Sequence, residues 1–161
     1  MKKWLVPGAL LFAAPAWAQT GDVAVVLAFA PYAHALAAMA GWGILMIVLS
    51  FLSIFGAPRG RTPSGMPVRD YSDPFYRRDR AFRNAVETAG LFLAVTLAAI
   101  LVGAAPFWVN LFASVFLAAR IAMAAIHIGT EIQPLRSVCW LTGTVCCLAL
   151  GIMALFGAFA L

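Results

Sequence analysis

The sequence predicts an all-α integral membrane protein that folds as a four-helix bundle of membrane-spanning helices. Hydrophobic residues make up 64% of its 161 residues and charged residues only 11%, and the mean hydropathy is +0.96. These values lie far outside the range of soluble domains. Because one span needs roughly 20 apolar residues, the chain has room for about four spans and for no separate soluble domain.

The N-terminal segment 1–18 has the layout of a secretory signal peptide. Two lysines, Lys2 and Lys3, precede a short apolar run at 5–14, and an Ala-Trp-Ala sequence at 16–18 forms a small-x-small cleavage site. The alternative is an uncleaved anchor, which the prolines in this segment disfavour because they interrupt a spanning helix. Cleavage would leave a membrane domain, 19–161, whose N-terminus lies outside.

A first span is expected at 32–55, and it is followed by the only sizeable hydrophilic segment, 57–83. Seven of the nine arginines lie in that segment. By the positive-inside rule the segment is a cytoplasmic loop, and this topology explains the net charge of +5 better than nucleic-acid binding does. The signal peptide and a mature chain with arginine as its only basic residue besides histidine suit a multi-pass protein of a bacterial inner membrane.

Three further apolar segments complete the predicted bundle, at 85–102, 107–128 and 138–161. A Gly-Ala-Ala-Pro turn joins the second span to the third, and a short polar turn returns the chain from the third span to the fourth. Both termini are therefore expected outside. The three cysteines all lie in the last segment without metal-ligand spacing, so we interpret them as packing residues and expect no metal site.

Polar residues lead directly into the second span along one helix face. Arg77, Arg80, Asn84 and Glu87 follow one another at spacings of three, four and three residues, which places them on the same side of a helix. The helix beyond them is apolar. A carboxylate such as Glu87 at the entrance of a span needs a partner, so this face predicts either an ion pair or a binding site.

Arg120 is the second unusual charge, because it lies inside the third predicted span, about 12 Å from its inner end. An arginine at such a depth costs about 2.5–3.5 kcal/mol on insertion scales, so it should face protein or a hydrated cavity. We expect Arg120 to pair with Glu87, which enters from the same side. His127 lies seven residues later on the same helix face, and Arg136 opens the fourth helix at the same surface.

Two interpretations of these charges remain open. In one, a buried bridge between Arg120 and Glu87 only fixes the packing, and the loop arginines hold the loop to anionic lipid. In the other, the arginines form a cationic pocket at the inner membrane face for a small anionic ligand. The excess of bases over acids favours an anion: Arg77, Arg80, Arg83, Arg120 and Arg136 stand against Asp79, Glu87 and Glu131.

Three short motifs occur in order along these helices. R-A-x-x-N-x-x-E begins at Arg80, A-R-I is centred on Arg120, and Q-P-x-R runs from Gln133 to Arg136. They are similar to motifs at the corresponding positions of the MAPEG family (membrane-associated proteins in eicosanoid and glutathione metabolism), which includes microsomal glutathione transferases and leukotriene C4 synthase. The resemblance covers roughly 77–155, and the ordered set is more specific than any one motif.

The resemblance implies a homotrimer with glutathione sites between neighbouring subunits, near the cytoplasmic face. It also implies that Arg136 stabilises the glutathione thiolate, since a nearby cation lowers the pKa of a thiol. Two positions depart from the family pattern: Phe82 stands where His or Gln is common, and His127 stands in place of a tyrosine. Besides Arg136, the resemblance implies these ligand-binding residues: Arg77, Arg80, Asn84, Glu87, Arg120, His127 and Gln133.

The expected activity is that of a glutathione- or thiol-dependent transferase or peroxidase acting on hydrophobic electrophiles or lipid hydroperoxides. The expected partners are the lipid bilayer and a hydrophobic small molecule. One alternative is a protein of the same fold that binds a lipid or a small anion without catalysis, and another is a purely structural membrane protein. An open basic pocket would favour the enzyme, whereas Arg120 and Glu87 closed onto each other would disfavour binding.

Overall fold

The computed structural model describes residues 28–161, so the predicted signal peptide lies outside the described residues. A short 3-10 turn, η3 (Ala30–Tyr32), leads into the first long helix, and the described helices that follow are α2 (Ala33–Ile54), α3 (Pro74–Leu101), α4 (Pro106–Gly129) and α5 (Gln133–Phe159). Each of these four is long and apolar enough to cross a membrane. The predicted all-α, four-span architecture is confirmed for the described part of the chain.

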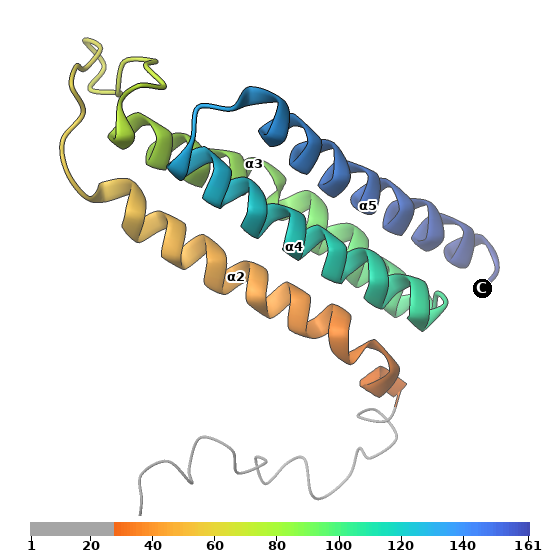
Figure 1. The fold of residues 1–161 in the computed structure, drawn as a ribbon. Coiled ribbons are helices and arrows are strands. Elements are labelled where there is room, and N and C mark those ends of the chain that lie inside the picture. The colour runs from red at the N-terminus through yellow and green to blue at the C-terminus, as the bar shows by residue number, and fades with distance from the viewer. Residues whose placement is uncertain (1–27) are drawn as a thin grey trace, which may run out of the picture. The chain divides into compact units, whose positions relative to one another are not determined.

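The four helices lie alongside one another within the unit Tyr32–Leu161 (Figure 1). α3 and α4 each pack against the three other helices, whereas α2 and α5 lie on either side of this central pair. Side chains that α3 and α4 turn toward each other are therefore enclosed on both sides. This arrangement decides which of the polar residues on these two helices are buried.

Three aromatic rings, one from each of α2, α3 and α4, fill the middle of the bundle. Phe92 and Phe116 stack with their ring centroids 3.9 Å apart, and the edge of Trp42 meets the Phe116 ring at 5.3 Å. All three side chains are at most 1% exposed. Because stacked and edge-to-face rings have preferred geometries, this cluster fixes the lateral positions of the helices one turn away from Arg120.

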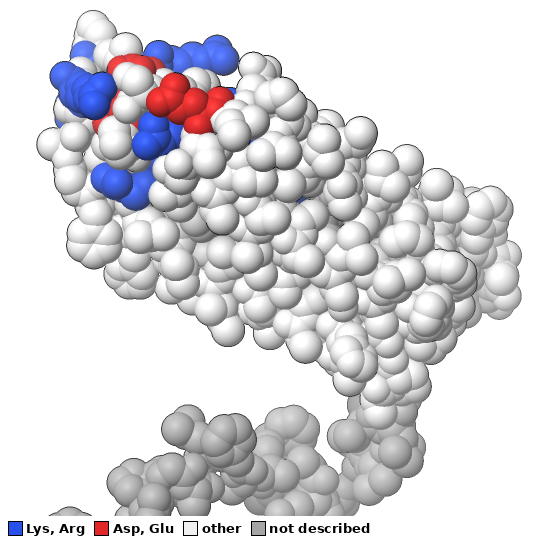
Figure 2. Space-filling model, in the orientation of Figure 1, with Lys and Arg blue, Asp and Glu red and all other residues white. Residues whose placement is uncertain are grey.

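Apolar side chains cover the outside of the bundle, and the exposed charged side chains of the described residues lie at one end. Large apolar residues are exposed on all four helices, for example Ile44, Leu97, Val115 and Leu148, as expected for a surface solvated by lipid. Figure 2 shows the arginine and acidic side chains gathered where α3 begins, with a white surface along the helices. The membrane-spanning part and the hydrophilic end are therefore clearly separated.

Helix α3 begins at Pro74, about three turns before the span predicted at 85–102. The Asp73 side chain caps it by accepting a hydrogen bond of 2.9 Å from the Phe75 backbone N–H, and Pro74 occupies the first turn. The last part of the predicted loop 57–83 is thus helical. Helix α3 begins before the predicted span because polarity indicates where the bilayer ends, whereas the cap determines where the helix begins.

Helix α5 also begins earlier than the span predicted at 138–161. It starts at Gln133, with Pro134 in its first turn, a position at which proline is well tolerated because its missing N–H would have no helical partner. Arg136 therefore lies inside the first turns of the helix. Its side chain is held by a regular backbone at the charged end of the bundle.

Candidate functional site

An open pocket lies at the charged end, where the start of α5 meets α3 and the last turns of α4. Its volume is about 210 Å³. Its wall combines basic, aromatic and apolar side chains. The residues that line it are Tyr71, Arg80, Met123, His127, Gln133, Arg136, Ser137 and Trp140.

Arg136 is the most enclosed cation of this open pocket. The residue is 9% exposed, and its guanidinium carbon lies 4.3 Å from the centre of the Tyr71 ring, a cation–π contact. Its Nη1 atom is buried and has no hydrogen-bond partner. An unpaired buried donor is costly unless something accepts its hydrogen bond, so Arg136 is suited to hold an anionic group of a ligand.

Arg80 contributes a second cation to the open pocket, but it is already paired. Its Nη1 donates to Glu87 Oε1 at 2.7 Å, and the two side chains are 31% and 54% exposed. They lie two helical turns apart on α3, as the sequence spacing requires. A pair this exposed contributes little to stability, about 0–1 kcal/mol, so an anionic ligand can compete with Glu87 for Arg80.

Arg77 does not line the open pocket, but its hydrogen bonds connect the segments beside the pocket. Its Nε donates to the Ile128 carbonyl at 3.1 Å and its Nη1 donates to the Tyr71 carbonyl at 2.8 Å, while Glu131 lies 3.5 Å away. These contacts join the end of α4 to the loop before α3. Arg77 therefore holds Tyr71 in place over Arg136.

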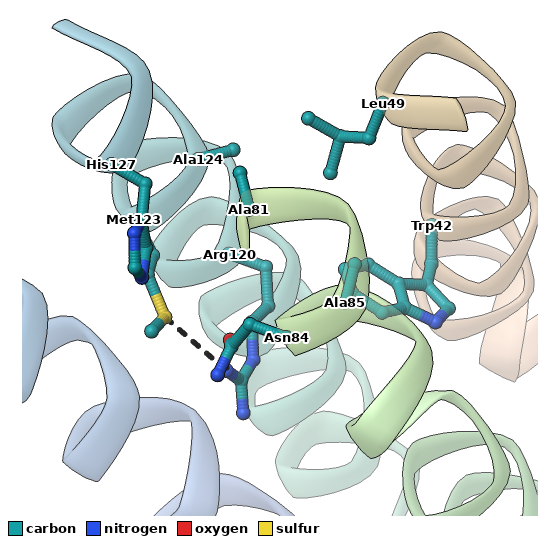
Figure 3. A pocket seen from close by; sticks show the side chains of 9 residues that line it. All are labelled: Trp42, Leu49, Ala81, Asn84, Ala85, Arg120, Met123, Ala124 and His127. Atoms are coloured by element: carbon teal, nitrogen blue, oxygen red, sulfur yellow. Dashed lines mark hydrogen bonds between the residues drawn. The ribbon is translucent and has the colours of Figure 1, made fainter. Parts of the chain in front are cut away.

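A second, inner cavity surrounds Arg120 between α2, α3 and α4 (Figure 3). Its volume is about 10 Å³, which is room for about one water molecule. The Arg120 Nη1 donates to Asn84 Oδ1 at 3.3 Å and contacts Met123 Sδ at 3.4 Å. Its guanidinium carbon lies 5.1 Å from the centre of the Phe116 ring. Arg120 is 3% exposed, so it is part of the protein interior.

The expected ion pair between Arg120 and Glu87 was wrong. Glu87 pairs with Arg80, and among the described residues Arg120 has the amide of Asn84 where we expected a carboxylate. The physical reason lies in the helix geometry. Side chains three residues apart on α3 point in directions that differ by about 60°. This rotation points Asn84 toward α4 and leaves Glu87 exposed at the surface.

His127 is the polar residue that lies between the two cavities. It is 5% exposed, it lines both the open pocket and the inner cavity, and its Nδ1 atom is buried without a hydrogen-bond partner. The predicted ligand-binding residues are thus divided. Arg80, His127, Gln133 and Arg136 line the open pocket, Asn84, Arg120 and His127 line the inner cavity, and Arg77 and Glu87 line neither.

Sequence reasoning missed four residues of the open pocket: Tyr71, Met123, Ser137 and Trp140. Ser137 lies four residues after Gln133, and Met123 lies four residues before His127, so helical spacing could have identified both. Tyr71 comes from the irregular loop, where no periodicity places a side chain. Trp140 lies four residues after Arg136 on α5, so the same helical spacing could have identified it.

The loop before α3 is held by Asp73, which is 4% exposed. Its Oδ2 atom accepts a hydrogen bond of 2.9 Å from the Arg59 backbone N–H, and its Oδ1 atom caps α3. The hydrogen bond from Arg59 is the main cause that lowers the pKa of the Asp73 carboxyl below its usual value of 3.8. The ionised form of Asp73 therefore stabilises the loop that carries Tyr71.

Comparison with known proteins identifies the family of this chain. No curated protein matched the sequence. The model of the MAPEG family matches residues 23–156, a range that includes the four helices almost completely and every residue of both cavities. Because the match spans most of the chain, the protein is a membrane protein that belongs to the MAPEG family.

Proposed function

We propose that the protein is a membrane-bound glutathione- or thiol-dependent transferase or peroxidase that acts on hydrophobic electrophiles or lipid hydroperoxides. The observation that carries this proposal is the buried, unpaired Nη1 of Arg136 at the wall of a basic pocket. Membership of the MAPEG family also supports the proposal. The pocket combines cations for an anionic peptide with aromatic and apolar walls for a second, hydrophobic molecule.

In the proposed reaction Arg136 stabilises the thiolate of bound glutathione. A free thiol has a pKa near 8.5, so only a small fraction is ionised at neutral pH, and a neighbouring cation increases that fraction. Arg80 and Gln133 would hold carboxylate and amide groups of the peptide, and His127 would hydrogen-bond a carboxylate or the thiol itself. None of these roles needs the buried Arg120 to touch the ligand.

Two outcomes are possible for the thiolate. In a transferase, its sulfur attacks an electrophilic carbon, a carbon–sulfur bond forms, and the displaced electron pair goes to the leaving group or is protonated. In a peroxidase, the sulfur attacks the terminal oxygen of a hydroperoxide, the O–O bond breaks, and the released alkoxide takes a proton from water to become the alcohol. A second glutathione then converts the resulting sulfenic acid to the disulfide and water. The apolar Trp140 side of the pocket suits acceptors dissolved in lipid.

A second candidate function is binding of a lipid or a small anion without catalysis. The observations that favour it are the existing pair of Arg80 with Glu87 and the histidine at 127, where the resemblance leads us to expect a tyrosine. In this case the open pocket would hold a phosphate or carboxylate head group. The two candidates differ in whether bound thiol becomes ionised.

The proposal includes an assembly and a location. We propose a homotrimer in a bacterial inner membrane, with both termini outside and the segment between α2 and α3 in the cytoplasm. The basic residues at this end support the orientation, and the resemblance supports the trimer. Native mass spectrometry of the detergent-purified protein measures the number of subunits, and a predominantly monomeric or dimeric species would contradict the trimer.

The test of function is equilibrium binding of glutathione to detergent-purified protein, followed by the ultraviolet absorbance of the thiolate. Saturable binding with thiolate at neutral pH is the result expected. Arg61→Gln serves as a control, because Arg61 is exposed and lines none of the described pockets near the site. If glutathione does not bind at millimolar concentration, the transferase proposal is rejected and a co-purified lipid or anion becomes the ligand to identify.

A further inference from the structure

Gly143 lies in α5 directly against the guanidinium of Arg120. A Cβ atom at position 143 would lie 3.0 Å from Nε, 3.1 Å from Nη2 and 3.2 Å from Cζ of Arg120. The Nε, Cζ and Nη2 atoms of the guanidinium therefore border the space that a Cβ atom at position 143 would occupy. Gly143 is buried, and every one of these distances is shorter than an ordinary van der Waals contact of a Cβ atom.

The Arg120 guanidinium has little room to move away from position 143. Phe116 contacts it through a cation–π interaction, with the ring centre 5.1 Å from Cζ. Asn84 Oδ1 and Met123 Sδ hold its Nη1 atom at 3.3 and 3.4 Å. A side chain at position 143 would therefore displace the guanidinium and weaken the contacts with Asn84 and Met123.

These contacts connect Arg120 to the open pocket, which it does not line itself. Met123 borders both cavities, so the position of its side chain depends on Arg120 on one side and shapes the open pocket on the other. We propose that Gly143 is a positioning residue: it admits the Arg120 guanidinium between α4 and α5, and Arg120 in turn fixes Met123 and Asn84 behind the ligand. The effect on glutathione rests on the proposed function, whereas the coupling of Gly143 to Arg120 does not.

The experiment compares Gly143→Ala with Gly151→Ala. Both variants place alanine in the interior of α5, so both gain the same helix propensity. At position 151 the nearest atom is Val95 Cγ1 at 3.5 Å, an ordinary contact. The readouts are the dissociation constant for glutathione, the unfolding midpoint in detergent, and the Nε–H resonance of Arg120 in protein labelled with ¹⁵N-arginine and assigned with Arg120→Lys.

Gly151→Ala is expected to match the wild type in affinity and in the Arg120 resonance. Gly143→Ala is expected to shift that resonance and to weaken glutathione binding by about tenfold, a typical coupling between residues in contact. In an Arg120→Lys background the same alanine should have little further effect, because the lysine side chain lacks the branched guanidinium that the Cβ atom meets.

Three results would overturn the proposal. The first is a Gly143→Ala protein with the wild-type Arg120 resonance and affinity, even if its unfolding midpoint falls. The second is an equal effect of the alanine in the wild-type and Arg120→Lys backgrounds. The third applies if Gly143→Ala does not fold. The double variant Gly143→Ala/Arg120→Lys is then expected to fold, as Arg120→Lys alone does. A double variant that fails to fold while Arg120→Lys folds would contradict the coupling. If the wild type binds no glutathione, the proposed function fails, while the resonance and the unfolding midpoints still decide the coupling.

Discussion

The open pocket and the inner cavity each contain a buried arginine, but the two arginines have different surroundings. Arg136 lies beneath the Tyr71 ring and has a buried Nη1 without an acceptor. Arg120 is enclosed by helices and donates its Nη1 to Asn84. The open pocket has about 210 Å³ and the inner cavity about 10 Å³. Each arginine also has one buried donor without a hydrogen-bond partner, Nη1 in Arg136 and Nε in Arg120. A buried cation thus indicates binding only where the space beside it can hold a ligand.

The two sites also differ in what builds their walls. The inner cavity is made only by residues of the long helices α2, α3 and α4, whereas the open pocket needs Tyr71 from the loop. Helix–helix packing in the aromatic core does not hold Tyr71. Its position depends on Arg77 and on the Asp73 cap, so the open pocket should be the more easily altered of the two.

The largest expected effect is that of Arg136→Gln on thiol chemistry. Removing this cation should lower thiolate formation or turnover by about 10²–10³-fold, as loss of one charged donor to a developing anion does. The unfolding midpoint should fall only slightly, because no described hydrogen bond of Arg136 is lost and its cation–π contact with Tyr71 contributes about 0.5–2 kcal/mol. Thiolate absorbance and steady-state kinetics measure the first quantity and thermal unfolding measures the second. Wild-type thiolate in this variant would remove Arg136 from the mechanism.

Arg120→Ala should affect stability more than chemistry. The substitution leaves a cavity and an unsatisfied Asn84 amide, which together cost about 2–4 kcal/mol. Unfolding in a denaturing detergent measures this loss. Glutathione that still binds should ionise at the same pH as in the wild type, because Arg120 does not line the open pocket. A raised thiol pKa at unchanged stability would instead show that Arg120 contacts the ligand.

Asp73→Ala should disturb the open pocket and leave the inner cavity intact. Loss of the helix cap and of the bond to Arg59 should destabilise the start of α3 by about 1–2 kcal/mol. Hydrogen exchange should therefore increase in the segment 57–76 and stay unchanged around Arg120. Asp73→Asn is the matched control, since asparagine also caps helices, and it should show a smaller increase.

Acid should have a similar effect on the wild type. The folded-state pKa of Asp73 lies below its usual value of 3.8, so its ionised form contributes stability above that value. The contribution is lost as the pH falls through the lower, folded-state pKa. Amide chemical shifts of Arg59 and Phe75, followed from about pH 6 to about pH 2, should report this loss below about pH 4. The Asp73→Asn variant should lack this transition.

The smallest expected effect is that of Glu87→Gln. Removing the exposed carboxylate frees Arg80 while changing stability by at most about 1 kcal/mol. Affinity for an anion in the open pocket should rise by a few-fold, measured as the glutathione dissociation constant. Arg80→Gln should have the opposite effect. Weaker binding in Glu87→Gln would indicate that Glu87 itself receives a group of the ligand.

Much of the fold could be predicted because it depends on composition and on long apolar segments. The four spans, the basic end and the helical spacing from Arg77 to Glu87 all follow from residue order. Helices α3 and α5 begin before the spans predicted at 85–102 and 138–161, because hydropathy locates the bilayer and not the helix cap. The expected partner of Arg120 was wrong because a helix face defined by spacing is broad, and a rotation of about 60° separates Asn84 from Glu87.

The sequence alone determined that this protein lies in a membrane, that its charge gathers at one end, and that it resembles the MAPEG family. Only the tertiary structure decided which arginine is available. Arg120 and Arg136 look alike in a sequence of apolar helices, and the difference between them comes from neighbours far away in the chain: Asn84, Phe116 and Gly143 for one, Tyr71 for the other. Such contacts depend on helix rotation and on a loop conformation, and local sequence patterns specify neither.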